Sequence, residues 1–210
     1  MILDLGNGYI LRRAAEADHA ALCMICLRTG AAGRDASDRE DAPDLLGLIF
    51  AVPYQVLEPE FSFVVEGPAG PSGYVLGARD TRRFNERLGA EWYPRLQQHV
   101  PPAPDEPARW RGSDWARHLI HHPPLEVPEA LRSYPSHGHI DLLPELRGRG
   151  IGRRAIGHLE QELRRAGSTG LCFEVDPRNE AARLFYQRLG FAQLLADTLP
   201  RTSVVFGKRL

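Results

Sequence analysis

The stretch that decides the fold is residues 141–154, which read DLLPELRGRGIGRR. An apolar strand-like run ends at Leu143, a turn follows, and glycines recur at positions 148, 150 and 152, where a helix is expected to begin. Glycine lets the backbone approach a ligand closely, and the first N–H groups of a helix favour negative charge. Arginines at positions 147, 149, 153 and 154 surround this point. The pattern predicts a binding site for a pyrophosphate group.

A tight strand-to-helix turn with solvated arginines is the alternative interpretation of this segment. The glycines do not match the two common phosphate-binding motifs: the ending Gly-Lys-Ser/Thr is missing, and so is the G-x-G-x-x-G spacing. No acidic ribose-binding residue follows at the expected distance in a repeated strand–helix–strand context. Nicotinamide dinucleotides are therefore disfavoured as ligands.

Strands and helices alternate on both sides of this segment. After it we expect a helix at 150–166, a strand at 170–175, a helix at 179–189 and strands at 191–195 and 203–208. Before it we expect strands at 9–12, 61–66, 73–80 and 137–143 and helices at 15–28 and 45–52, with GPAGPSG (67–73) as a hairpin turn. The alternation predicts an α/β (α+β) fold in which helices flank a mixed, mostly antiparallel sheet of about six or seven strands.

The region between positions 81 and 136 interrupts the rhythm of strands. A helical stretch covers 83–99, PPAPDEP (101–107) breaks it, and tryptophans, histidines and prolines follow. No self-sufficient core pattern is present there, so we interpret it as a helical insertion into a single domain that covers residues 1–210.

Composition excludes several classes of function. Of the 210 residues, 26 are basic and 27 acidic, so the net charge of −1 gives no general attraction to nucleic acid or to an anionic membrane. The longest apolar block, Leu45–Val52, is too short to span a bilayer, and the amino terminus lacks a signal-peptide pattern. The three cysteines cannot all pair within one chain, which favours a reducing compartment. We therefore expect a soluble cytoplasmic protein with neither nucleic-acid nor membrane partners.

A second segment, residues 174–191 (EVDPRNEAARLFYQRLGF), completes the sequence pattern. Together the two segments resemble the GNAT superfamily of acetyl-CoA-dependent N-acetyltransferases. The first fits its R/Q-x-x-G-x-G/A motif with Arg147, Gly150 and Gly152. The second fits N-x-x-A-x-x-h-Y-x-x-x-G-F with Asn179, Ala182, Tyr186, Gly190 and Phe191.

A closer likeness is to the carboxy-terminal acetyltransferase-like domain of the O-GlcNAcases. It is similar through residues 73–96, the YPS at 134–136, Asp141 and the EVDP…FYQRLG run. The animal versions of that domain lack the glycine motif, whereas this chain has it. The resemblance therefore implies a competent acetyl-CoA site in what we expect to be a stand-alone protein without a glycosidase half.

The resemblance also implies residue roles. The backbone N–H of Leu142 would polarise the thioester carbonyl, and Tyr186 would protonate the departing thiolate, with a merely packed aromatic ring as the alternative. Asn179 would cap the following helix, and contact with the coenzyme is a further role for it. The residues expected to bind the coenzyme are Leu142, Leu143, Arg147, Gly148, Arg149, Gly150, Ile151, Gly152, Arg153, Asn179, Ala182, Phe185 and Tyr186.

The general base is open at this stage. Asp141 leads because the O-GlcNAcase-like domain shares it, with a carboxylate held by backbone or arginine groups as the alternative, and Glu174 is a second candidate. His137 and His139 alternate with Asp141 on one strand face. The further candidates for the acceptor wall and the base are Asp80, Glu91, Trp92 and Asp176.

Other features have simpler explanations. Cys23 and Cys26 are three positions apart on an expected helix, which favours a buried face over a zinc site, and His118, His121 and His122 favour a solvated loop over a metal cluster. No metal is implied. The expected function is acetyl transfer from acetyl-CoA to a primary amine on a small molecule or a protein lysine, by direct attack. A non-catalytic acyl-CoA-binding module is the alternative, and the acceptor and oligomeric state stay open.

Overall fold

The computed structural model describes residues 2–199 and 202–210. Its strands are β1 (Leu3–Gly6), β2 (Tyr9–Arg13), β3 (Ser62–Gly67), β4 (Gly70–Ala78), β5 (Ser136–Leu142), β6 (Gly170–Val175), β7 (Ala192–Leu194) and β8 (Val204–Arg209). Its helices are α1 (His19–Thr29), α2 (Leu45–Phe50), α3 (Val52–Leu57), α4 (Thr81–Arg87), α5 (Tyr93–Gln97), α6 (Asp114–His121), α7 (Ile151–Arg165) and α8 (Glu180–Arg188).

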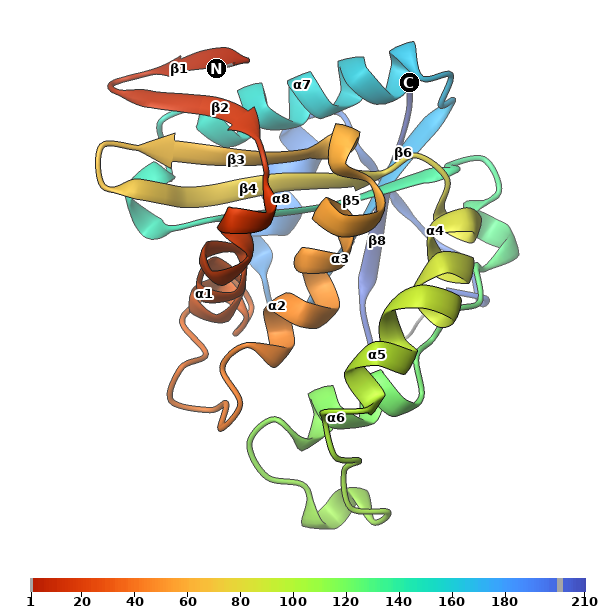
Figure 1. Cartoon of the computed structure of the whole chain (residues 1–210). Helices are drawn as coiled ribbons and strands as arrows, with labels where there is room; N and C mark the ends of the chain where they lie inside the picture. The colour runs from red at the N-terminus through yellow and green to blue at the C-terminus, as the bar shows by residue number, and fades with distance from the viewer. Residues whose placement is uncertain (1, 200–201) are drawn as a thin grey trace.

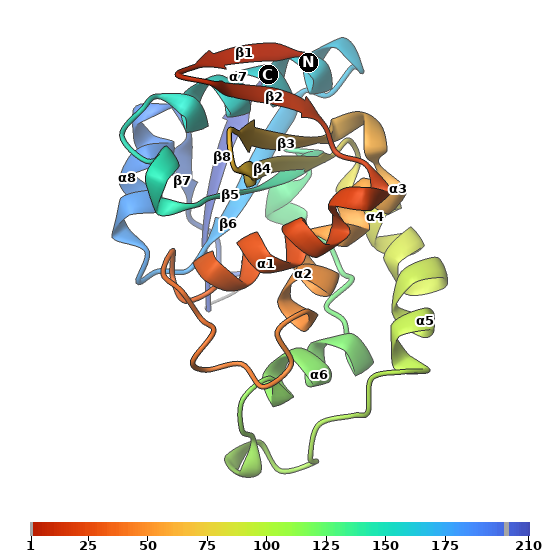
Figure 2. The same ribbon diagram turned by 60° about the vertical axis from the view of Figure 1, so that its left-hand side comes forward.

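The strands form one sheet in the order β1-β2-β3-β4-β5-β6-β8-β7. Every neighbouring pair is antiparallel except β5 and β6, because the crossover through α7 returns the chain in the same direction. Helices α1–α3 cover one face of the sheet, and α7 and α8 cover the other (Figures 1 and 2). The predicted mixed, mostly antiparallel α/β architecture is confirmed.

The core divides by the alternation of side chains along each strand. On β4, Tyr74 and Leu76 belong to the cluster that packs under α1–α6, whereas Val75 belongs to the cluster under α7 and α8. On β6, Leu171 and Phe173 face α7 and α8. The sheet therefore separates two layers, and any site between β5 and β6 opens to both.

The number of strands was underestimated. Strand β1 was not predicted, and it pairs with β2 across a tight turn in which Asn7 and Gly8 both have positive φ. The β3–β4 hairpin turn is also shorter than GPAGPSG, because Gly67 and Gly70 already pair across it. Eight described strands result in place of six or seven.

The insertion carries more helix than the sequence predicted. The expected helix at 83–99 is α4 and α5 joined by a π-helical turn at Leu88–Trp92. The region around His118 and His121, interpreted above as a loop, is helix α6, which packs with α2 and α5 on the side of the sheet that α1–α3 cover (Figure 2). None of the helices in residues 2–199 and 202–210 is both long and apolar enough to cross a membrane.

Candidate active site

Strands β5 and β6 separate in the middle of the sheet. They pair only from Ser136 with Leu171 to Gly138 with Phe173, and the rest of β5 pairs with β4 alone. A Cβ at Gly138 would lie 2.6 Å from the Phe173 ring, so glycine is required at this last paired position. Beyond it, the edge of β5 that faces β6 is free.

The hydrogen bonds of β5 show which of its backbone N–H groups point to the free edge. The N–H of Leu143 donates to the carbonyl of Ser72 on the β4 side at 3.0 Å. Because successive backbone groups in a strand point to opposite edges, the N–H groups of Ile140 and Leu142 face the gap. The N–H of Leu143 is therefore engaged, and that of Leu142 is placed where an oxyanion could accept a hydrogen bond from it.

The glycine-rich loop presents a row of free donors at the start of α7. Gly148 and Gly150 have φ of 72° and 74°, a conformation that side chains with a Cβ rarely adopt, and open space lies beside both. The N–H groups of residues 148–153 donate to no atom of the described chain. Such unpaired donors at a helix N-terminus form an anion site.

The arginines around this loop hold its neighbours in place. Arg147 donates to the carbonyl of Gly33 at 2.6 Å, Arg149 to that of Glu145 at 2.7 Å, and Arg154 to that of Asp4, while Arg153 is exposed. These carbonyl contacts leave the guanidinium charges uncompensated by carboxylates within the described residues. The loop is thus both positively charged and supported from three directions.

Helix α8 closes the other side of the gap. The side chain of Asn179 caps it by accepting from the N–H of Ala182 at 3.1 Å. A Cβ at Gly152 would lie 3.0 Å from both Leu142 and Phe185, so glycine lets α7 approach β5 and α8 closely. The residues of the two sequence motifs are brought together around the gap.

Tyr186 lies inside the layer between the sheet and helices α7 and α8. Its ring stacks on Phe173 with the centroids 4.8 Å apart, and it is 5 % exposed. Burial, and next the charge of Asp141, raise the pKa of its hydroxyl above the ordinary value. The hydroxyl forms no hydrogen bond with the described residues. It is also not among their fully buried polar atoms that lack a partner. A neutral hydroxyl is therefore available as a donor.

Asp141 lies on the opposite face of the sheet, with His137 and His139. Its Oδ2 accepts a hydrogen bond from the Tyr74 hydroxyl and lies 3.0 Å from Nε2 of His139. The side chains of His139 and Asp141 are 27 % and 18 % exposed. Solvent therefore reaches the centre of the sheet from the face that α1–α3 cover.

An aromatic wall extends from this face to the insertion. We define it as Phe50, at the end of α2, and Trp115, on α6. Their rings stack with the centroids 6.3 Å apart, and Phe50 contacts the His139 ring edge-on at 6.2 Å. The indole N–H of Trp115 donates to Glu40 at 3.1 Å. Phe50 was not among the predicted residues, since nothing in its local sequence marks it.

The remaining predicted acceptor residues have local partners. Asp80 caps α4 by accepting from the N–H of Arg83 at 3.0 Å, and Glu91 pairs with Arg87 on an exposed surface. The buried Trp92 donates to the carbonyl of Leu48 at 2.8 Å. These contacts support structural roles for all three residues.

The two acidic candidates at the end of β6, Glu174 and Asp176, lie at the protein surface. Glu174 is exposed and accepts from the Ser203 hydroxyl at 2.7 Å, and Asp176 pairs with Arg178 at 2.6 Å. Glu174 shares the face of β6 with Cys172, the face on which Asp141 lies on β5. Burial raises the pKa of the Cys172 thiol to about 12, so it stays protonated.

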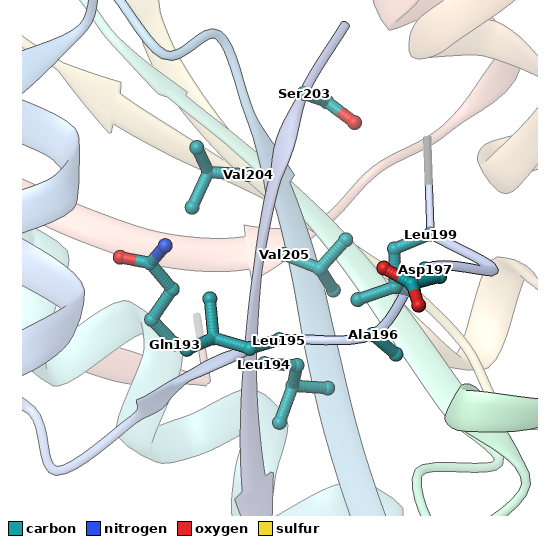
Figure 3. A pocket seen from close by; sticks show the side chains of 9 residues that line it. All are labelled: Gln193, Leu194, Leu195, Ala196, Asp197, Leu199, Ser203, Val204 and Val205. Carbon is teal, nitrogen blue, oxygen red and sulfur yellow. The ribbon is translucent and has the colours of Figure 1, made fainter. Parts of the chain in front are cut away.

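A separate hollow of about 210 Å³ lies beside β8, between that strand and the segment after β7 (Figure 3). Its walls are aliphatic apart from Gln193, Asp197 and Ser203. It holds no pair of groups for acid–base chemistry. Among residues 2–199 and 202–210, no cluster of three or more histidine, cysteine or acidic side chains is arranged for a metal ion.

Comparison with known proteins agrees with this geometry. Residues 127–191 match the model of the Acetyltransferase (GNAT) family. Protein O-GlcNAcase of Rattus norvegicus is 24 % identical over 204 residues, which cover 96 % of this chain and 22 % of that protein. The chain thus spans about a fifth of the length of the curated relatives it matches.

Solved structures extend the likeness to the whole chain. The crystal structure of SsHAT is 35 % identical and superposes with a TM-score of 0.87, covering 96 % of this chain and 98 % of that one. A GNAT superfamily phosphinothricin acetyltransferase (Pat) from Sinorhizobium meliloti, in complex with AcCoA, is 13 % identical with a TM-score of 0.55, covering 97 % and 89 % of the two chains. The second likeness is one of fold alone.

Proposed function

We propose that this chain, which belongs to the GNAT acetyltransferase family, transfers the acetyl group of acetyl-CoA to a primary amine by direct attack. The observation that carries the proposal is the gap between β5 and β6, which connects a loop of free N–H donors on one face with a carboxylate on the other. The cysteine usage is suited to a reducing, cytoplasmic location, which we propose with it.

The donor occupies the α7–α8 side in this proposal. The N–H groups of residues 148–153 bind the diphosphate, helped by the charges of Arg147, Arg149 and Arg153. The free edge of β5 then pairs with the amide groups of the pantetheine arm. This places the thioester in the gap, with its carbonyl oxygen toward the N–H of Leu142 and its sulfur toward Tyr186.

The acceptor enters from the face that carries Asp141. Its ammonium group must lose a proton before attack, since an alkylamine has a pKa near 10. The amine nitrogen then attacks the thioester carbonyl carbon, and the N–H of Leu142 stabilises the resulting oxyanion. Collapse forms the amide and breaks the C–S bond. The thiolate takes a proton from Tyr186, which is replenished from water, and the nitrogen releases its second proton.

The aromatic wall of Phe50 and Trp115 defines which amines suit the site. The Phe50 ring lies beside His139 and the Trp115 ring stacks on Phe50, so an acceptor that reaches Asp141 passes an apolar, π-rich surface. Such a surface favours a cation in contact with a ring face. We therefore propose an acceptor whose amine is carried on an apolar or aromatic stem.

Calorimetric titration with acetyl-CoA and an assay of thiol release test the function together. Suitable amine probes are tyramine, spermidine, glucosamine and a lysine-containing peptide. The proposal predicts saturable binding of acetyl-CoA and amine-dependent release of coenzyme A with at least one probe. Binding without turnover for all of them would favour a non-catalytic module, and no binding would refute the donor site.

A further inference from the structure

The carboxylate of Asp141 is held by only one of its oxygens. Both the hydroxyl of Tyr74 and Nε2 of His139 contact Oδ2. Within the described residues, Oδ1 accepts no hydrogen bond. Two contacts to the same oxygen thus orient the group and leave its second oxygen available for a ligand on the acceptor face.

Within the described residues, the His139 ring has one charged hydrogen-bond partner, Asp141, and also a hydrogen bond to the Phe50 backbone. On its own strand it faces Asp141 and also His137, whose pKa burial lowers to about 4 and which is therefore neutral. Strand β4 contributes Tyr74, and burial raises the pKa of that phenol, so it is neutral too. Helix α1 contributes the Cys26 thiol, which contacts Tyr74 and is protonated because burial raises its pKa. Phe50 of α2 and Trp115 of α6 are uncharged. The neighbouring β6 carries Cys172 and the exposed Glu174.

We propose that His139 and Asp141 act as one proton-accepting pair, in which Oδ1 of Asp141 binds the ammonium group of the acceptor and the imidazole of His139 stores the proton. This inference rests on the proposed acetyl transfer and adds a residue to it. An aspartate alone is a weak base for an ammonium group, whereas an imidazole accepts protons near neutral pH.

The proton can be followed atom by atom. The N–H bond of the ammonium group breaks, and its proton moves to Oδ1 while the amine keeps the electron pair for attack. The carboxyl group then rotates about its Cβ–Cγ bond, so that the protonated oxygen lies beside Nε2 of His139, and its O–H bond breaks as the proton passes to Nε2. Water removes this proton after the amide has formed. No oxidant, metal or other co-reactant is required.

Titration of the pair has a defined direction. Burial lowers the pKa of His139, but the charge and hydrogen bond of Asp141, together with a hydrogen bond to the Phe50 backbone, outweigh burial, so the net pKa lies above the ordinary 6.5. The accepting form is the one that lacks the shared proton, so it predominates only above that pKa. We expect kcat/KM to rise with pH through an apparent pKa above about 6.5, which belongs to the pair.

The variant His139→Gln separates a chemical role from a structural one. The Gln amide can still donate to Oδ2 of Asp141 but cannot take up a proton. We expect kcat to fall by about 100-fold, the scale typical of a lost general base, and the rising limb above pH 6.5 to disappear. His158→Gln is the matched control, because His158 packs against Phe63 on the α7 side. The His158→Gln variant should keep both the wild-type kcat and the rising limb of the pH profile.

Asp141→Asn gives the second test. Removal of the negative charge should lower the pKa of His139, which NMR titration of its imidazole measures without any acceptor. Acetyl-CoA binding by both variants shows that they are folded. If His139→Gln keeps the wild-type rate and pH profile, the inference is wrong and the proposed function stands. If the wild-type protein transfers acetyl to no amine probe, the proposed function fails and the inference with it.

Discussion

Tyr186 and Asp141 come from opposite faces of the same sheet and meet at the gap between β5 and β6. The phenol is buried among the aromatic rings of the α7–α8 layer, and the carboxylate is held by Tyr74 under α1–α3. Their positions on opposite faces suit the proposed reaction, in which the leaving group and the attacking group approach one carbonyl carbon from two sides.

Removal of the phenol hydroxyl tests this assignment. We expect Tyr186→Phe to lower kcat by about 10- to 100-fold, since a thiolate that leaves unprotonated is a poorer leaving group. Affinity for acetyl-CoA should be unchanged, because the ring packing persists. Tyr9→Phe, on the distant β2, is the control. Thiol-release kinetics and calorimetry measure both quantities, and full activity of Tyr186→Phe would remove the acid assignment.

The sequence could indicate Asp141 but not the pair it forms with His139. The alternation of His137, His139 and Asp141 placed them on one face from spacing alone. The structure adds Tyr74, which is 67 positions away in sequence, and Phe50, which meets His139 only through the packing of α2 on the sheet. Contacts of this kind depend on tertiary packing, and local patterns carry no signal for them.

At the scale of elements, the turn from β5 into α7 carries the proposed diphosphate site. Its glycines adopt left-handed φ values so that a row of N–H groups points into open space. The motif was predictable because the geometry is local: it needs residues without a Cβ next to a helix start. The same reasoning explains the correct placement of α7, β6 and α8.

Among the elements that escaped prediction, β1 and α6 did so for clear physical reasons. Strand β1 has only four residues, too few for a clear alternation, although the Asn7-Gly8 pair is a strong hairpin signal that could have revealed it. Helix α6 spans Asp114–His121 between proline-rich segments, and its stability comes from packing of Ala116 and Ile120 against the core. Short elements depend on tertiary contacts more than on their own propensities.

Gly150→Val tests the loop against a matched control. Gly150 and Gly167 begin and follow the same helix, both have positive φ, and both have open space around them. Either substitution should cost about 1–2 kcal/mol of folding free energy, which is visible as a lower Tm. Only Gly150→Val should weaken acetyl-CoA binding, by at least about tenfold in Kd. Equal affinities of the two variants would contradict a diphosphate site at this turn.

At the scale of the whole molecule, the insertion lies on the side that we propose for the acceptor. Residues 81–136 project past the sheet (Figure 1). The loop before α2 is joined to α6 by the Arg117–Asp41 ion pair, and to the residue before α6 by the Ser113–Glu40 hydrogen bond. The donor side uses α7 and α8, which lie outside the insertion. Donor and acceptor recognition are therefore assigned to different parts of the chain.

Trp115→Leu tests this division. Loss of the stacked indole should raise the KM of the amine about fivefold or more and leave the Kd of acetyl-CoA unchanged, because the ring lies in the aromatic wall. Trp110→Leu is the control within the insertion, since Trp110 contacts Pro104 and His118 instead. Steady-state kinetics with an amine probe would contradict the division if both variants behaved alike or if acetyl-CoA affinity fell.

The most direct measurement is a crystal structure of the protein with acetyl-CoA. We predict that the diphosphate accepts hydrogen bonds from the N–H groups of residues 148–153 and the thioester oxygen from that of Leu142. The sulfur should lie beside Tyr186, and the carbonyl carbon should be open toward Asp141. A diphosphate bound elsewhere, or a thioester closed off from the face of Asp141, would contradict the account.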